Sequence, residues 1–266
     1  MAHSGTSMGR KLLLTGILLS VLALAAAFFL PRDRDAGAGS ALRVGAGDDI
    51  TGVLLSEISA CAEADGAGDA LVGSYLFADC CSSAAQWALQ AEEIDLGFYC
   101  AQAALAMVNQ TDAFEIYSPA IMNSEVLAYL DSSQDLQSMG IPRKRSFLED
   151  IARDSYPQLQ SFSEINRTYL TYALETGDVD SVLLDVGDAA RVEDDKIRFL
   201  PASSTPYISY CMVVRKDIEE TKAFQQFLTY YEQAVDQLND PEYLVQLLGK
   251  DQEFWDMTGL EFLYAV

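Results

Sequence analysis

Hydrophobic and polar positions follow two alternating periods from residue 41 onward. Short apolar runs with a strand-like period are each followed by a segment with apolar residues at helical spacing. In the first third of the chain, strands are expected at 41–47, 70–77 and 94–99, and helices at 51–64, 84–92 and 101–108. Strands that alternate with helices over short connections predict a parallel sheet covered by helices.

The same alternation continues to the end of the chain. Further strands are expected at 114–122, 125–129, 139–141, 179–184, 197–200 and 207–214. Further helices are expected at 146–155, 169–175, 222–238 and 242–248, with a turn at Asp185–Asp188 before a short helix and an aromatic surface segment at 254–266.

Two such units in one chain usually form two lobes, so the predicted fold class is α/β with a ligand cleft between lobes. The stretches near Tyr117 and Tyr207 are the natural crossover points. Lobe 1 would then comprise residues 41–119 and 208–266, and lobe 2 residues 120–207.

An uncharged apolar run covers residues 12–30, with Arg10 and Lys11 directly before it. As a helix it would span roughly 28 Å, close to the thickness of a bilayer core. Residues 1–35 are therefore expected to be a secretory signal peptide or an uncleaved signal anchor, followed by a flexible linker at 36–40. An anchor would hold the domain at the extracytoplasmic face of the cell membrane, and cleavage would make it secreted or periplasmic.

Composition narrows the function classes mainly by exclusion. The chain has 17 Lys and Arg against 40 Asp and Glu, and its net charge of -23 disfavours binding of nucleic acid. The only histidine is His3, which precedes the predicted domain. Ser-His-Asp catalysis, Cys-His catalysis and His-based metal sites are therefore excluded within the fold. We expect no enzymatic activity, no cofactor and no metal site.

Five segments, in order, resemble bacterial extracytoplasmic solute-binding proteins of ABC transporters. The segment 42–45 (LRVG) is similar to the family's first strand, and 91–98 (AEEIDLGF) to a strand of its first lobe, with Glu92 in place of a glycine. The other three are 135–142 (DLQSMGIP), which is followed by Ser146, then 175–182 (ETGDVDSV) and 210–217 (YCMVVRKD). The resemblance covers residues 41–249 and implies the type II periplasmic-binding fold, near the phosphonate, sulfonate and thiamine-precursor binding groups.

This resemblance implies a protein that captures a small-molecule solute by hinge closure and delivers it to an ABC permease. The implied partners are the solute, the permease and, through residues 12–30, the membrane, with the protein as a monomer. One alternative is a membrane-anchored sensory or partner-binding module on the same fold. Another is an enzyme or redox protein that uses Cys80 and Cys81.

The resemblance also implies that ligand loops lie at 47–51, 79–83, 99–102, 142–146 and 185–188. The candidate ligand-binding residues on these loops and at the crossover are Asp48, Asp49, Thr51, Ser82, Ser83, Tyr99, Gln102, Tyr117, Arg143, Ser146, Asp185 and Asp188.

Each group of candidates has a second interpretation. Serine hydroxyls beside helix N-termini suit an oxyanion, but they also cap helices. The basic run 143–145 would clamp a carboxylate, sulfonate or phosphonate, or form a solvated surface. The carboxylates would bind a cationic or amine ligand, or cap helices. The tyrosines at 99, 117, 207 and 210 would stack on a ligand, line the hinge or pack in the core.

The chain has five cysteines, so at least one has no partner within the chain. Cys61 and Cys211 are expected to be buried as small hydrophobic residues. Cys80, Cys81 and Cys100 end neighbouring predicted strands, where a soft-metal or thiol-reactive site is the alternative.

Overall fold

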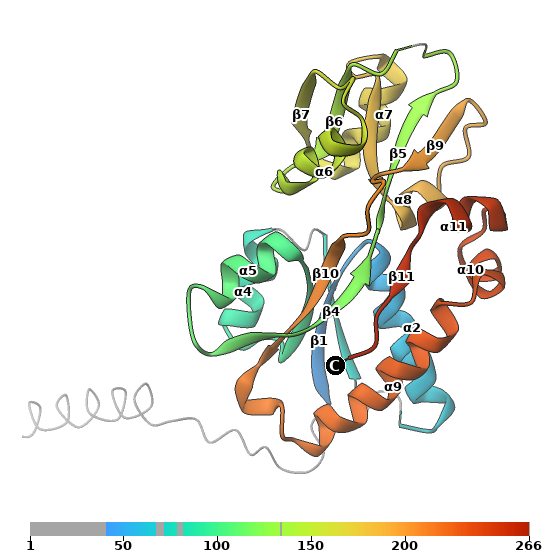
Figure 1. The fold of residues 1–266 in the computed structure, drawn as a ribbon. Helices are drawn as coiled ribbons and strands as arrows, with labels where there is room; N and C mark the ends of the chain where they lie inside the picture. Colours follow the sequence, from blue (N-terminus) through green and yellow to red (C-terminus); the bar gives the residue numbers. More distant parts are fainter. Residues whose placement is uncertain (1–40, 68–71, 79–81, 134, 266) are drawn as a thin grey trace, which may run out of the picture. The chain divides into compact units, whose positions relative to one another are not determined.

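The computed structural model describes residues 41–67, 72–78, 82–133 and 135–265 (Figure 1). The chain from Ala41 onward forms one compact unit. The predicted signal segment 1–35, its apolar run 12–30 and the linker 36–40 lie outside the described residues. Within the described ranges, no helix is both long enough and apolar enough to cross a membrane.

A six-stranded sheet contains the first strands of the unit and its last ones, in the order β11-β4-β10-β3-β1-β2. β1 pairs in parallel with β2 and β3, whereas β10 is antiparallel to both β3 and β4. The bounds are β1 Leu42–Gly47, β2 Val72–Phe77, β3 Leu96–Cys100, β4 Phe114–Met122, β10 Ile208–Arg215 and β11 Glu261–Phe262. β3 is buried along its whole length, which explains its continuous apolar sequence.

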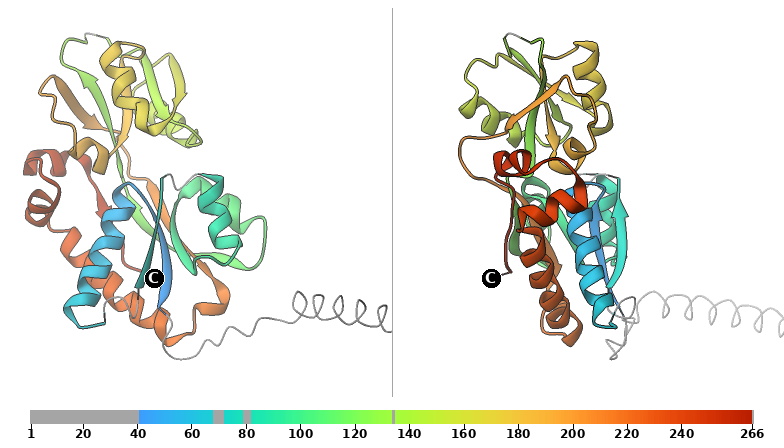
Figure 2. Two further views of the ribbon diagram at one scale, coloured as in Figure 1. Left: turned by 180° about the vertical axis from the view of Figure 1, so that it is seen from behind. Right: turned by 90° about the vertical axis from the view of Figure 1, so that its right-hand side faces the viewer.

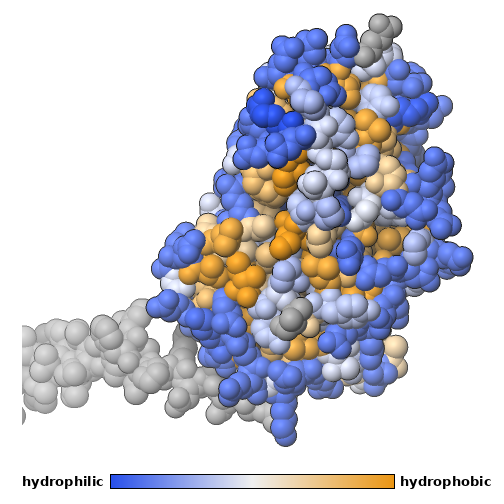
Figure 3. Space-filling model, viewed as in Figure 1, coloured by the Kyte–Doolittle hydropathy of each residue, from blue (hydrophilic) through white to orange (hydrophobic). Residues whose placement is uncertain are grey.

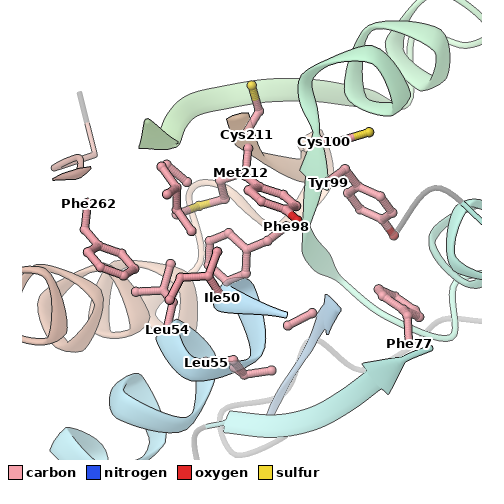
Figure 4. Packing of buried hydrophobic residues seen from close by; sticks show 14 of the residues in the cluster. Ile50, Leu54, Leu55, Phe77, Phe98, Tyr99, Cys100, Cys211, Met212 and Phe262 are labelled. Carbon is pink, nitrogen blue, oxygen red and sulfur yellow. The ribbon is translucent and has the colours of Figure 1, made fainter. Parts of the chain in front are cut away.

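Helices cover both faces of this sheet, with α2 and α9 on one side and α4 and α5 on the other (Figures 1 and 2). On α9, Phe224, Phe227 and Tyr231 recur at helical spacing and are buried. Figure 4 shows how Ile50 and Leu54 of α2 meet side chains of the sheet in this core. The bounds are α2 Ile50–Ala64, α4 Ser83–Gln90, α5 Ala101–Val108, α9 Lys222–Leu238, α10 Pro241–Leu248 and α11 Gln252–Thr258.

A five-stranded sheet is built from the middle of the chain, in the order β7-β6-β8-β5-β9. β6 is parallel to β7 and β8, and β5 is antiparallel to β8 and β9. The strands are β5 Glu125–Leu130, β6 Ser138–Pro142, β7 Ser161–Ile165, β8 Ser181–Asp185 and β9 Ile197–Pro201. Its helices are α6 Phe147–Ser155, α7 Leu170–Thr176 and α8 Val186–Ala190, with a short 3-10 turn at Arg167–Tyr169. A second 3-10 turn, Lys216–Ile218, follows β10 of the six-stranded sheet.

Two adjacent crossings connect the sheets, from β4 to β5 and from β9 to β10. Asn123 donates its backbone N–H to the carbonyl of Tyr207 at 3.2 Å, and its side chain accepts the N–H of Tyr207 at 3.1 Å. The N–H of Ser124 donates to Ser209 Oγ at 2.9 Å. These bonds tie the two crossings together where the chain passes from one sheet to the other.

The predicted α/β class is confirmed, and the predicted helices 101–108 and 222–238 match α5 and α9 at both ends. The segment 254–266, expected to pack on the surface through its aromatic residues, contributes more to the core than predicted. Phe254, Trp255 and Phe262 are buried in the core because α11 and β11 pack their aromatic side chains inward. The expected turn at 185–188 is wrong beyond Asp185, since α8 already begins at Val186. β7 was not predicted at all.

Candidate functional site

Charged side chains lie mostly on the surface, and on the face in Figure 3 hydrophilic residues surround a more hydrophobic middle. Within the described ranges, the charged side chains that are buried are Asp49, Glu57, Asp95, Glu125, Arg145 and Asp185. Two of them have partners elsewhere, because Glu57 accepts from Tyr243 and Asp95 pairs with Arg43. The other four lie together between the two sheets, where burial of charge is costly and therefore informative.

Arg145 is central to this group. Its guanidinium donates to Glu125 Oε1 at 2.7 Å and lies 3.6 Å from Asp49 Oδ2. It also donates to the hydroxyl of Tyr210, which in turn donates to Asp49 Oδ2 at 2.9 Å. We call Asp49, Glu125, Arg145, Asp185 and Tyr210 the junction cluster. Its members come from both halves of the fold, since Asp49 and Tyr210 adjoin the six-stranded sheet and the other three the five-stranded sheet.

Asp185 joins the N-termini of two helices. Its Oδ1 accepts the backbone N–H of Ile50, at the start of α2, at 3.0 Å and that of Gly187, in α8, at 2.9 Å. The approach is close, because a Cβ at Gly187 would lie 3.0 Å from this oxygen and 3.5 Å from the nitrogen of Ile50. Asp49 is the N-cap of α2 and accepts from both the N–H and the hydroxyl of Thr51. One carboxyl group from each half therefore accepts a backbone N–H at the N-terminus of α2.

The position of Tyr210 depends on an irregularity in the sheet. The pairing of β10 with β4 shifts register on both sides of Tyr210. Such bulges bend a strand and redirect its side chains. The Tyr210 hydroxyl also lies 3.4 Å from Asp185 Oδ2, so that it contacts carboxylates of both halves.

Burial perturbs the acid–base properties of this region. Desolvation, followed by the charge of Asp49, raises the pKa of Asp185 well above its usual range. Desolvation and the neighbouring Glu125 carboxylate raise the pKa of Tyr207, whose hydroxyl donates to Glu125 Oε2 at 2.8 Å. Three carboxyl groups thus share one guanidinium in the cluster, and the protonated form of Asp185 is favoured there.

A second link between the halves lies next to the cluster. Arg167 binds Asp188 through two hydrogen bonds of 2.6 and 2.8 Å, and it also donates to the backbone carbonyl of Asp48. Burial alone would lower the pKa of Arg167, but the hydrogen bonds and charge of Asp188 outweigh it and raise that pKa. At another point, Gln102 Nε2 donates to Ser146 Oγ at 3.3 Å and connects α5 to the start of α6.

Several solved structures are similar to this chain in fold. The ligand-binding component of an ABC-type import system from Staphylococcus aureus, with zinc bound, superposes with a TM-score of 0.66 at 12% identity, over 85% of this chain and 86% of that one. The alkanesulfonate-binding protein SsuA from Xanthomonas axonopodis pv. citri, bound to MOPS, gives 0.59 at 14% identity, with 84% of each chain covered. A nutrient-binding protein from Burkholderia cenocepacia, bound to methionine, gives 0.55 at 14%, over 83% and 99%.

The fold is that of ABC-type substrate-binding proteins. The resemblance noted in the sequence is thereby confirmed for the fold. No protein-family model matches the sequence, and a search of the curated proteins finds no match. The structural neighbours are binding proteins rather than enzymes.

The substrate-binding fold brings some of the predicted site residues together and separates others. Asp49, Thr51 and Asp185 meet at the junction cluster, and Asp188 lies next to it. Asp48 is exposed and contributes its backbone carbonyl, whereas Gln102 and Ser146 meet on the exposed surface between α5 and α6.

The remaining candidates have structural roles or point into solvent. Ser82 caps α4 by accepting from the N–H of Ala85, and Ser83 is exposed. Tyr99 is fully buried and donates to the carbonyl of Ala85 at 2.9 Å. Tyr117 packs edge-on against Phe224 of α9 at 5.0 Å. Arg143 is exposed. Residues 79–81 of the predicted loop lie outside the described residues.

Two members of the junction cluster, Glu125 and Arg145, were not predicted to lie in a buried site. Arg145 belongs to the basic run 143–145, in which the sequence points to Arg143 as the ligand-binding residue. The left-handed backbone of Lys144, with φ of 67°, separates the exposed Arg143 from the buried Arg145. Glu125 begins an apolar strand and pairs in register with Asp185, which is the signal that identifies it once the sheet is known.

The cysteines do not form a site in the described part of the fold. Cys61 and Cys211 are buried, as expected, and carry no disulfide. Cys100 is buried at the end of β3, and Cys80 and Cys81 lie outside the described residues. Among the residues described, no group of three or more His, Cys, Asp or Glu side chains is arranged to hold a metal ion.

Proposed function

We propose that this chain is an extracytoplasmic solute-binding protein that captures a small molecule between its two sheets and delivers it to the permease of an ABC importer. The junction cluster is the observation that carries the proposal. Buried ion pairs add little net stability to a fold, so their concentration at the meeting point of two halves favours a role in binding. The neighbouring structures support it, since they include a sulfonate-binding protein and an ABC import component.

The polar contacts across the junction suit a reversible closure. Asp49 and Tyr210 belong to one half, and Arg145 and Asp185 to the other. Hydrogen bonds and ion pairs of this kind exchange readily for bonds to water, so the two halves could separate to admit a solute, and their polar groups would meet again on closure. The hydrogen-bonded crossings at Asn123 and Tyr207 would serve as the hinge.

The other parts of the proposal rest on the sequence. We propose lobes at 41–119 with 208–266, and at 120–207, and residues 12–30 as the signal or anchor that places the domain outside the cytoplasm. The protein would act as a monomer and without catalysis. The loops that carry Asp49, Thr51, Asp185 and Asp188 would contribute most of the ligand contacts.

A thermal-shift screen of the full-length protein against small amines, amino acids, sugars and oxyanions tests the proposal. A solute present at about 100 times its Kd should raise the free energy of unfolding by about 2.7 kcal/mol. Asp49→Ala should abolish that shift, whereas Asp240→Ala, which removes an exposed helix cap on α10, should retain it. A broad library without a stabilising compound would contradict solute capture. Co-purification with a sensor kinase instead of a permease would favour the sensory alternative.

A further inference from the structure

We propose that Asp185 is a specificity-determining residue that excludes solutes with an oxyanionic group from the junction, an inference that rests on the proposed function. The sequence alone favours the opposite specificity, because serine hydroxyls, helix N-termini and a basic run are typical of oxyanion sites. The arrangement of the described side chains around Asp185 argues against that specificity in three steps.

The first step concerns the helix amides. The N-terminus of α2 would offer its first backbone N–H groups to an anion. The Ile50 N–H is already bound by Asp185 Oδ1 at 3.0 Å, and the same oxygen takes the N–H of Gly187. Asp49 takes the N–H of Thr51 at 2.9 Å. The chain's own carboxyl groups thus occupy the positions that a sulfonate, phosphonate or carboxylate of a solute would need.

The second step concerns the buried cation. Arg145 donates to Glu125 at 2.7 Å and to Tyr210, and it lies 3.6 Å from Asp49. In the closed arrangement, an anionic solute that took the place of Glu125 or Asp49 on this guanidinium would leave that carboxylate buried without its partner. Such a displacement is strongly unfavourable. The exposed Arg143 lies outside the cluster and offers no replacement there.

The third step concerns the charge that a solute would meet. The cluster contains two carboxylates, from Asp49 and Glu125, one guanidinium, and the carboxyl group of Asp185, for which burial favours the protonated form. The neighbouring Asp188 pairs with Arg167 and also with Arg191, which is exposed, so that water screens its charge. An incoming anion would therefore meet an excess of buried negative charge at short range, where water screens it poorly. Asp185 is the member of the cluster that occupies the helix amides an anion would need.

Calorimetric titration of the full-length protein with MOPS, an organic sulfonate, and with inorganic phosphate tests the inference. The wild type should bind neither at millimolar concentration. Asp185→Ala vacates the amides of Ile50 and Gly187 and should bind at least about tenfold more tightly than the wild type. Asp185→Asn should gain less, because its amide oxygen still accepts from Ile50. Asp240→Ala, the matched loss of a capping carboxylate on α10, should gain nothing.

Each outcome of these titrations supports or overturns the exclusion of oxyanions by Asp185. Oxyanion binding by the wild type as tight as that of Asp185→Ala would overturn the inference, and so would an equal gain in Asp240→Ala. If Asp185→Ala does not fold, Asp185→Asn takes its place, and the absence of any gain in that variant would overturn the inference. A wild type that captures an amine while the Asp185 variants gain nothing overturns the inference and leaves the proposed function intact. If the wild type binds no solute and the Asp185 variants bind phosphate, the inference stands and the proposed function is overturned.

Discussion

Replacing Arg145 by methionine tests whether the junction cluster is held together by its single cation. Methionine keeps much of the apolar stem and removes the charge. The arginine side chain is only 4% exposed, and Glu125 Oε1 accepts from it at 2.7 Å. The substitution leaves the carboxylates of Glu125 and Asp49 buried without their counter-ion.

The expected loss of stability follows from these contacts. Breaking a buried ion pair by removing one partner costs about 3–5 kcal/mol. Glu125 keeps hydrogen bonds from Tyr207 at 2.8 Å and Ser209 at 3.2 Å, which compensate part of its charge. We therefore expect the lower end of the range, about 3 kcal/mol. For a domain of this size that loss lowers Tm by roughly 6–12 °C.

Urea unfolding followed by circular dichroism measures the effect, with Arg143→Met as the matched control. Arg143 lies two residues away and is exposed, so its replacement should change the free energy of unfolding by less than about 0.5 kcal/mol. Adding Glu125→Gln to Arg145→Met should restore about 1–2 kcal/mol, because it removes the stranded charge. Equal losses in the two methionine variants would refute the reasoning.

Three further predictions concern titration, thiol reactivity and packing. Because burial raises the folded pKa of Asp185, its stabilising contribution is complete below the unfolded pKa of about 3.9 and is lost as the pH rises through the folded value. Asp185→Asn should therefore gain stability relative to the wild type as the pH rises above about 4 in urea titrations, and a difference independent of pH would contradict this sign. Burial raises the pKa of Cys211 to about 11, so a thiol reagent at about pH 8 should modify it much more slowly in the native state than in urea, and Cys211→Ser identifies its signal. Phe227→Ala should cost about 3–5 kcal/mol in chemical denaturation because the ring is fully buried. Trp87→Ala, at a side chain that is 57% exposed, should cost less than about 0.5 kcal/mol, and similar losses in both would argue against the packing described.

The elements that could be predicted from the sequence are those with a strong local signal. The helix α9 carries aromatic residues at helical spacing and a threonine cap at Thr221, so that both of its ends were predicted correctly. β7 has no comparable signal, because its sequence SFSEI is mostly exposed and it pairs only along the edge of its sheet. The burial of β11 likewise depends on β4, which lies far away in the sequence.

The candidate site, too, could be predicted from the sequence only in part. Asp49 and Asp185 could be selected because each lies at the carboxyl end of a strand, where side chains from several strands lie close together. The sequence of the basic run does not indicate which of its three cations turns inward. That choice depends on the backbone at Lys144 and on Glu125, which lies 20 residues away along the chain. Contacts between distant segments are absent from local periodicity, so this part of the site required the fold.

The order of strands in the six-stranded sheet has a consequence for how the protein is made. β10 lies between β3 and β4, yet it comes from residues 208–215, and α9 supplies core side chains from still later in the chain. The five-stranded sheet uses only the continuous stretch 125–201. Chains fold as their segments emerge from synthesis, so the inserted half should acquire its structure first. The half that contains the N-terminal strands cannot complete its sheet until the last quarter of the chain has been synthesised. Until then its apolar strands are exposed to aggregation or to chaperones.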